Sequence, residues 1–176
     1  MKKILGVLFI LVLANTIAKA QYNNWAIGFQ LVEPSGLNIR KYYGDNKAFD
    51  VSVGTYGLFY GRDRSYRQGS YHNAGWSARI MHLWHRPIFK SDRWRTSYGF
   101  GGQINSRRYY FPSRNTPNIL EYDATLSLGG AGQAGLEYFL PNSPLSAFAD
   151  VGLYVEILPA PFFIHPLGSI GVRYNF

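Results

Sequence analysis

The last ten residues of the chain, 167–176, alternate between two kinds of side chain. Ile170, Val172, Tyr174 and Phe176 fall on one side of an extended backbone, and the residues between them are small or polar. Successive side chains of a β-strand point to opposite faces, so one face of this segment is apolar and the other is polar. A strand with one face in lipid and the other in the polar interior of a barrel has this pattern. The segment therefore predicts a transmembrane β-strand.

The start of the chain has the pattern of a secretory signal peptide. An apolar run from Ile4 to Ala18 follows two lysines, and Ala18-Lys19-Ala20 has the small-x-small form of a cleavage site. The apolar run is about 15 residues long, which is shorter than the roughly 20 residues that a membrane-spanning helix needs. We expect segment 1–20 to be removed, which leaves 21–176 as one exported domain.

Composition narrows how such a chain could be held together. The sequence has no cysteine, which excludes disulfide bonds and a lipid anchor on a cysteine after the signal peptide. No later segment is apolar enough to form a transmembrane helix, so a membrane location would require a β-barrel. Aromatic residues make up 17% of the chain, as two aromatic girdles at the membrane interfaces would require.

The charge of the chain indicates which partners suit it. The net charge is +8, and it falls to +5 when the three lysines of segment 1–20 are removed. A basic exported protein favours acidic partners, such as lipopolysaccharide phosphates or anionic glycans. We expect no nucleic-acid partner, because the sequence holds no recognition motif and export separates the chain from nucleic acid.

Eight segments of the mature chain are predicted to be β-strands. They are 25–32, 37–43, 48–58, 75–84, 94–104, 124–139, 146–157 and 167–176. Short turns are expected at 44–46, 86–92 and 141–144, and long polar loops at 60–73 and 105–121, which is the alternation of turns and loops in outer-membrane barrels. The prediction is all-β: an eight-stranded antiparallel up-and-down transmembrane barrel. In the fourth segment, Met81 and Leu83 fall opposite its other apolar residues, so either a bulge changes the register or these two side chains fill the lumen.

The polar faces of these segments carry balanced charges. Four arginines and four acidic residues point to one side: Arg40, Arg79, Arg95, Arg173, Asp50, Glu137, Asp150 and Glu156. An eight-stranded barrel has room inside for side chains and little else, and buried charges must be paired. We expect an ion-pair network that plugs the lumen, which disfavours an open pore. The alternative is a soluble lipocalin-like or sandwich protein whose apolar faces meet inside.

Several segments resemble a known family. Residues 33–42 followed by 46–50, then 135–138, 144–151 and 168–176, are similar to small, largely uncharacterised outer-membrane β-barrel proteins of Gram-negative bacteria. The resemblance implies an eight-stranded barrel of the OmpA/OmpX-like type, and it implies no activity. The terminal segment also resembles the signal by which outer-membrane barrels are recognised for insertion. That likeness implies the barrel-insertion machinery as a partner, with Tyr174 and Phe176 as the signal.

The two long loops contain the candidate binding residues. Arginines alternate there with aromatic residues, and the candidates are Arg62, Arg64, Arg67, Arg107, Arg108, Tyr109 and Tyr110. Arginine forks bind phosphates, and they stack on aromatic faces. We therefore expect the loops to contact outer-membrane lipids and lipopolysaccharide, or an external glycan or protein partner.

Two other functions stay open as alternatives. An outer-membrane enzyme acting on lipid or peptide could use His72 near Ser70, or His165 near Ser113, but no spacing supports either pair. A narrow channel for small solutes would require an unblocked lumen. Histidines three apart on a strand face opposite sides, so no metal site is expected, and no cofactor is expected either. The preferred interpretation is a non-enzymatic barrel with a structural or interaction role.

Overall fold

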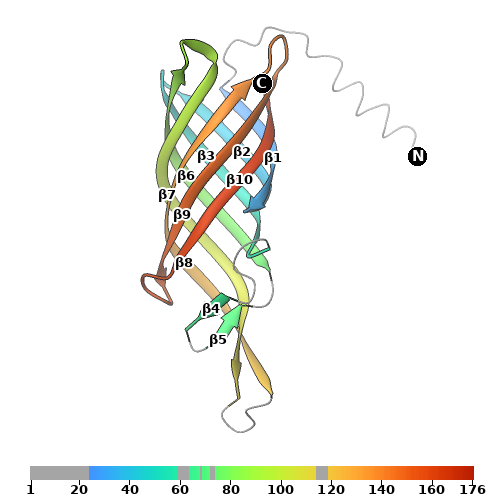
Figure 1. The fold of residues 1–176 in the computed structure, drawn as a ribbon, viewed down its shortest axis with the longest axis vertical. Coiled ribbons are helices and arrows are strands. Elements are labelled where there is room, and N and C mark those ends of the chain that lie inside the picture. The colour runs from blue at the N-terminus through green and yellow to red at the C-terminus, as the bar shows by residue number, and fades with distance from the viewer. Residues whose placement is uncertain (1–23, 59–63, 68, 72–73, 114–118) are drawn as a thin grey trace, which may run out of the picture.

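A computed structural model of the chain describes residues 24–58, 64–67, 69–71, 74–113 and 119–176. The predicted signal peptide lies outside these described residues. The described part is all-β, and eight of its strands close into an antiparallel barrel (Figure 1). The predicted eight-stranded antiparallel barrel is therefore confirmed.

The barrel strands follow one another around the wall in chain order. They are β1 (Trp25–Glu33), β2 (Ser35–Tyr43), β3 (Lys47–Tyr56), β6 (Gly75–Ile88), β7 (Ser91–Pro112), β8 (Leu120–Phe139), β9 (Leu145–Leu158) and β10 (Ile164–Asn175). Each pairs with the next, and β10 pairs with β1 to close the wall. A small hairpin of β4 (Arg64–Tyr66) and β5 (Gly69–Tyr71) lies outside the barrel and pairs with β7.

The two ends of the barrel differ (Figure 1). At one end, which we call the terminal end, Trp25 and Phe176 exchange backbone hydrogen bonds of 3.3 and 2.9 Å, and the strands are joined by short turns. The first of these turns places Gly44 at a φ of 57°, which glycine adopts at no steric cost. At the opposite end, which we call the loop end, β7 and β8 continue well past their neighbours as a long hairpin.

The predicted loop at 105–121 is mostly wrong, because β7 continues to Pro112 and β8 begins at Leu120. Here the hairpin extends past β6 and β9, so both of its faces carry polar residues and the alternation that marks a strand is lost. The predicted loop 60–73 is also wrong in part, because it contains the two short strands of the β4–β5 hairpin. The predicted connection 86–92 is also too long, because strand structure interrupts only at residues 89–90.

The fourth predicted segment has a simple explanation. Met81 and Leu83 are fully buried in the lumen, where they pack in a small apolar cluster with Ala48 and Tyr154. The register between β6 and β7 is unbroken along this stretch and shifts only between Pro87 and Ile88. The second of the two alternatives therefore holds: these side chains fill the lumen.

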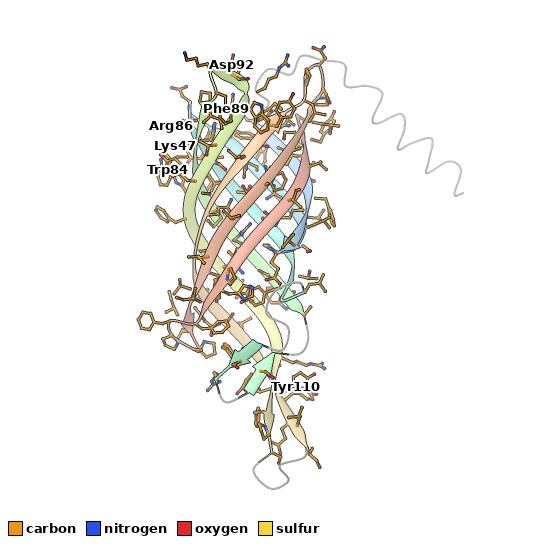
Figure 2. All side chains as sticks on the ribbon, viewed as in Figure 1. Lys47, Trp84, Arg86, Phe89, Asp92 and Tyr110 are labelled. Atoms are coloured by element: carbon orange, nitrogen blue, oxygen red, sulfur yellow. The ribbon has the colours of Figure 1, made fainter. Side chains whose placement is uncertain are left out.

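The distribution of side chains is the reverse of that in a soluble protein (Figure 2). Apolar residues on the outside of the wall are exposed, from Phe29 on β1 to Val151 on β9, whose exposed fraction is 70%. The arginines and acids of the lumen are buried, and the exposed fraction of Arg40, Asp50 and Arg173 is 1% each. A charged interior and an apolar exterior are therefore properties of the whole wall.

Candidate functional site in the lumen and at the loop end

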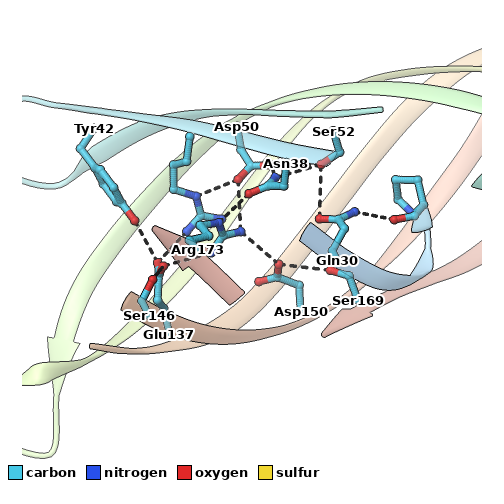
Figure 3. A network of polar contacts seen from close by, with 12 residues as sticks. Gln30, Asn38, Tyr42, Asp50, Ser52, Glu137, Ser146, Asp150, Ser169 and Arg173 are labelled. Carbon is cyan, nitrogen blue, oxygen red and sulfur yellow. Dashed lines mark hydrogen bonds and ion pairs between the residues drawn. The ribbon is translucent and has the colours of Figure 1, made fainter. Parts of the chain in front are cut away.

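Four charged side chains meet in the lumen toward the terminal end, and Figure 3 shows them from close by. Arg40 from β2 donates from Nε to Asp50 Oδ2 at 2.7 Å and from Nη1 to Glu137 Oε2 at 2.9 Å. Arg173 from β10 donates from Nη1 to Glu137 Oε1 at 3.1 Å, and its Nη2 lies 3.4 Å from Asp50 Oδ2. The two arginines thus share two carboxylates, and all four side chains are buried. We call this group the ionic cluster.

Neutral groups complete the ionic cluster. Asn38 accepts from Arg173 Nε at 2.5 Å and donates to Asp50 Oδ1 at 2.7 Å. The hydroxyls of Tyr42 and Ser146 donate to Glu137 at 3.1 and 2.7 Å. Buried ions are tolerated when their remaining hydrogen-bonding positions are occupied. These neighbours occupy most of those positions, and Arg40 Nη2 is the atom of the two guanidinium groups that is buried without a hydrogen-bond partner among the described residues.

The Arg173 guanidinium also stacks on an aromatic ring. It lies 3.4 Å from the ring centroid of Phe148, and Asp150 lies 4.0 Å from its Nη2. A Cβ at Gly171 would come within 2.7 Å of the Phe148 ring, so glycine is what makes room for this stack. The cluster therefore links β2, β3, β8, β9 and β10 across the lumen.

The other three residues predicted for the network lie at different distances from the ionic cluster. Arg79 is buried on β6, next to the cluster, and takes part in none of its hydrogen bonds. Arg95 lies directly opposite Glu137 in the β7–β8 ladder, with its guanidinium 5.2 Å from the ring centroid of Phe139. Glu156 lies at the loop end, where Tyr66 and the backbone of Ala160 donate hydrogen bonds to it.

Glu156 is the anchor of a cap over the loop end of the lumen. The Tyr66 hydroxyl of β4 donates to Glu156 Oε1 at 2.5 Å, and the backbone N–H of Ala160 donates to the same oxygen at 2.9 Å. The Tyr66 ring packs edge-on against Tyr109 and Phe163. Three segments that are distant in the sequence therefore meet at one buried tyrosine, which we call the tyrosine cap.

A buried pair near the loop end was not found by sequence reasoning. Glu33 Oε2 and His165 Nε2 lie 2.5 Å apart, and the ring of Tyr56 lies 4.6 Å from the imidazole. Both members of the pair are buried, which keeps them from a substrate outside the barrel. No sequence pattern marked this pair, because alternation along β1 puts Glu33 on the outer side with Phe29 and Leu31.

The predicted loop residues divide between two faces of the long hairpin. Tyr109 faces the cap, and Arg67 donates to its hydroxyl at 3.3 Å. Arg108 lies on the other face with its guanidinium 4.8 Å from the ring centroid of Tyr122, and Tyr110 packs on the same ring. Arg64 lies in β4 and Arg107 in β7. Arg62 lies outside the described residues. Tyr122 was missed because it lies between the predicted loop 105–121 and the predicted strand 124–139.

Comparison with known protein families and curated sequences found no relative of this chain, which matches no protein-family model and no curated protein sequence. Among the described residues, no group of three or more histidine, cysteine or acidic side chains could hold a metal ion. No helix formed by the described residues is long and apolar enough to cross a membrane. A functional conclusion therefore depends on the geometry alone.

Proposed function

We propose that this chain is a non-enzymatic β-barrel of the outer membrane of a Gram-negative bacterium, exported by its signal peptide. The observation that carries the proposal is the apolar exterior around a closed barrel with a charged interior. Apolar side chains exposed around the entire wall are unfavourable in water and favourable in lipid. A closed barrel also leaves no unpaired strand edge in the hydrocarbon region.

Aromatic side chains at the terminal end support this location and an orientation. Trp94 packs against both Phe89 and Tyr138 outside the wall, and Trp84 stacks with Tyr98 nearby. Figure 2 shows Trp84 and Phe89 at this end, with charged Arg86 and Lys47 beside them. Such a girdle is typical of a membrane–water interface. With its short turns, the terminal end then faces the periplasm and the loop end faces outward.

The end of the chain fits the same proposal. Tyr174 and Phe176 lie on the outer face with their ring centroids 6.3 Å apart, and the exposed fraction of Phe176 is 51%. The edge of β10 that pairs with β1 is free until the barrel closes, so this strand and its outer aromatic side chains are accessible during assembly. We propose that the barrel-insertion machinery recognises this segment.

The barrel acts through its outward loops and not through a pore. The ionic cluster and the tyrosine cap obstruct the lumen at two levels. Arg108, Tyr110 and Tyr122 form a basic and aromatic surface on the outer face of the long hairpin, past the apolar belt. Its chemistry suits the phosphates and sugars of lipopolysaccharide, with an external glycan or protein as the other candidate partners.

Cell fractionation tests the location. We expect the protein in the outer-membrane fraction, without residues 1–20, and with a gel mobility that changes on heating because a folded barrel resists cold detergent. Mass spectrometry of the N-terminus checks the cleavage. Recovery in the soluble periplasmic fraction would contradict the proposal.

Charge reversal at Arg108 tests the outward surface. We expect Arg108→Glu to weaken binding to lipopolysaccharide vesicles about fivefold, or about 1 kcal/mol, because one exposed charge pair becomes repulsive. The matched control is Arg86→Glu, the same change at an exposed residue of the terminal end. Vesicle flotation at low and high salt measures the effect, which salt should reduce. Equal binding by both variants would remove this surface from the proposal.

A further inference from the structure

A second set of buried polar side chains lies between the ionic cluster and the tyrosine cap. Ser77 and Arg79 come from β6, Gln103 from β7 and Gln133 from β8, and all four are buried. In the ladder, Arg79 lies opposite Gln103 on one side and Ser52 on the other. Asp50 of the ionic cluster lies two residues from Ser52 on β3, toward the terminal end. The set is therefore adjacent to the ionic cluster on its loop-end side.

These side chains have polar atoms that are buried and lack hydrogen-bond partners. The atoms are Arg79 Nε, Ser77 Oγ, Gln103 Oε1 and both amide atoms of Gln133. Buried polar groups in folded proteins are almost always hydrogen-bonded, and ordered water supplies the partners that the protein does not. Because several such atoms lie on neighbouring strands, the same group of water molecules could supply hydrogen bonds to all of them. We infer that this part of the lumen is hydrated.

The hydrated region is closed on both sides. Toward the terminal end, Arg40, Asp50 and Glu137 cross-link the wall. Toward the loop end, Tyr66 covers the opening through its hydrogen bond to Glu156. The cap is the weaker closure, because β4 and β5 are three-residue strands attached at one edge, whereas the ionic cluster joins barrel strands.

Burial decides what kind of molecule can enter. Three charged residues border this region and are themselves buried, with Arg79 on one wall, Asp150 beside the cluster and Glu156 at the cap. Moving an ion from water into a buried site costs far more free energy than moving a neutral molecule there, and a neutral molecule could bond to the same atoms that water satisfies. We propose that the outer half of the lumen is a capped chamber for small uncharged hydrogen-bonding molecules, admitted when Tyr66 leaves Glu156.

The absence of cysteine from the sequence allows a direct test. Ser77→Cys introduces the single thiol into the chamber at a residue whose hydroxyl has no partner to lose. Its reaction with neutral methyl methanethiosulfonate, and with anionic and cationic methanethiosulfonates of similar size, is followed by mass spectrometry on folded protein in detergent. We expect the neutral reagent to react at least about tenfold faster than either charged reagent, because access depends on local opening and on charge.

Opening the cap should accelerate that reaction. In Ser77→Cys protein, Tyr66→Ala should raise the rate of the neutral reagent at least about tenfold. Tyr66→Phe, which keeps the ring and removes the hydrogen bond to Glu156, covers the case in which Tyr66→Ala does not fold. Asp92→Cys, at an exposed turn of the terminal end, is the control whose rate should be the same with and without Tyr66 (Figure 2).

Each outcome decides the proposal. A thiol at residue 77 that stays unreactive in the opened cap would show that no chamber exists, and Gln133→Cys, two strands further along the wall on β8, repeats that test. If the charged reagents react as fast as the neutral one, the preference for uncharged molecules is contradicted. If the substitutions at Tyr66 leave the reaction rate unchanged, Tyr66 does not control entry to the chamber. The test depends on the closed barrel and not on the proposed membrane location, so the two can fail separately.

Discussion

Replacing Glu137 by glutamine should lower the free energy of unfolding by about 3–5 kcal/mol, the cost of removing one partner from a buried ion pair. Glu137 accepts hydrogen bonds from Arg40, Arg173, Tyr42 and Ser146, and it is fully enclosed by them. The amide of glutamine would remove the negative charge and direct an N–H₂ group at neighbours that are themselves donors. Two buried guanidinium groups would then share Asp50 and the more distant Asp150.

The measurement is equilibrium unfolding in urea of protein folded into lipid vesicles, with the folded fraction read from unheated gel samples. Glu121→Gln is the matched control, because Glu121 lies on the same strand and is exposed on the long hairpin. The control should change the free energy by no more than about 0.5 kcal/mol. A loss below about 1 kcal/mol for Glu137→Gln would mean that the cluster does not stabilise the barrel.

Introducing an arginine on the outside of the wall should separate a membrane barrel from a soluble one. Val151 is exposed near the middle of β9, and it lies between the small residues Ala134 and Gly168 of the neighbouring strands. An arginine there has room, so the change adds charge without crowding. In lipid, Val151→Arg should cost about 2–4 kcal/mol, because the charge would lie near the bilayer midplane. In water, the same exposed substitution should be within about 0.5 kcal/mol of neutral.

Leu120→Arg is the matched control for this experiment. Leu120 is 55% exposed and lies at the far end of the long hairpin, eight residues before Leu128, where pairing with β9 begins. Eight residues span roughly 26 Å of strand, which places Leu120 beyond the apolar belt. We expect Leu120→Arg to be near neutral in the same vesicle unfolding measurement. Near-neutral values for both variants would contradict membrane insertion and favour a soluble barrel.

Local properties of the sequence were sufficient to place the strands and their faces. Side-chain direction has a period of two residues in any strand, so alternation alone put Arg40, Asp50 and Arg173 on one side and Val151 and Ile170 on the other. The same argument failed in the long hairpin. There both faces are polar, and a pattern that depends on a difference between two environments disappears.

The contacts among the lumen residues depended on the closure of the barrel. Arg40 and Glu137 are 97 residues apart and meet only because the strand registers, added around the closed wall, bring β2 and β8 to the same level. The same closure left Arg79 outside the ion pairs and brought Glu33 to His165. Alternation thus determined which side chains enter the lumen. The pairing registers, taken together around the closed barrel, decided which of them touch. They set the position of each strand along the barrel axis, and no local sequence pattern specifies that position.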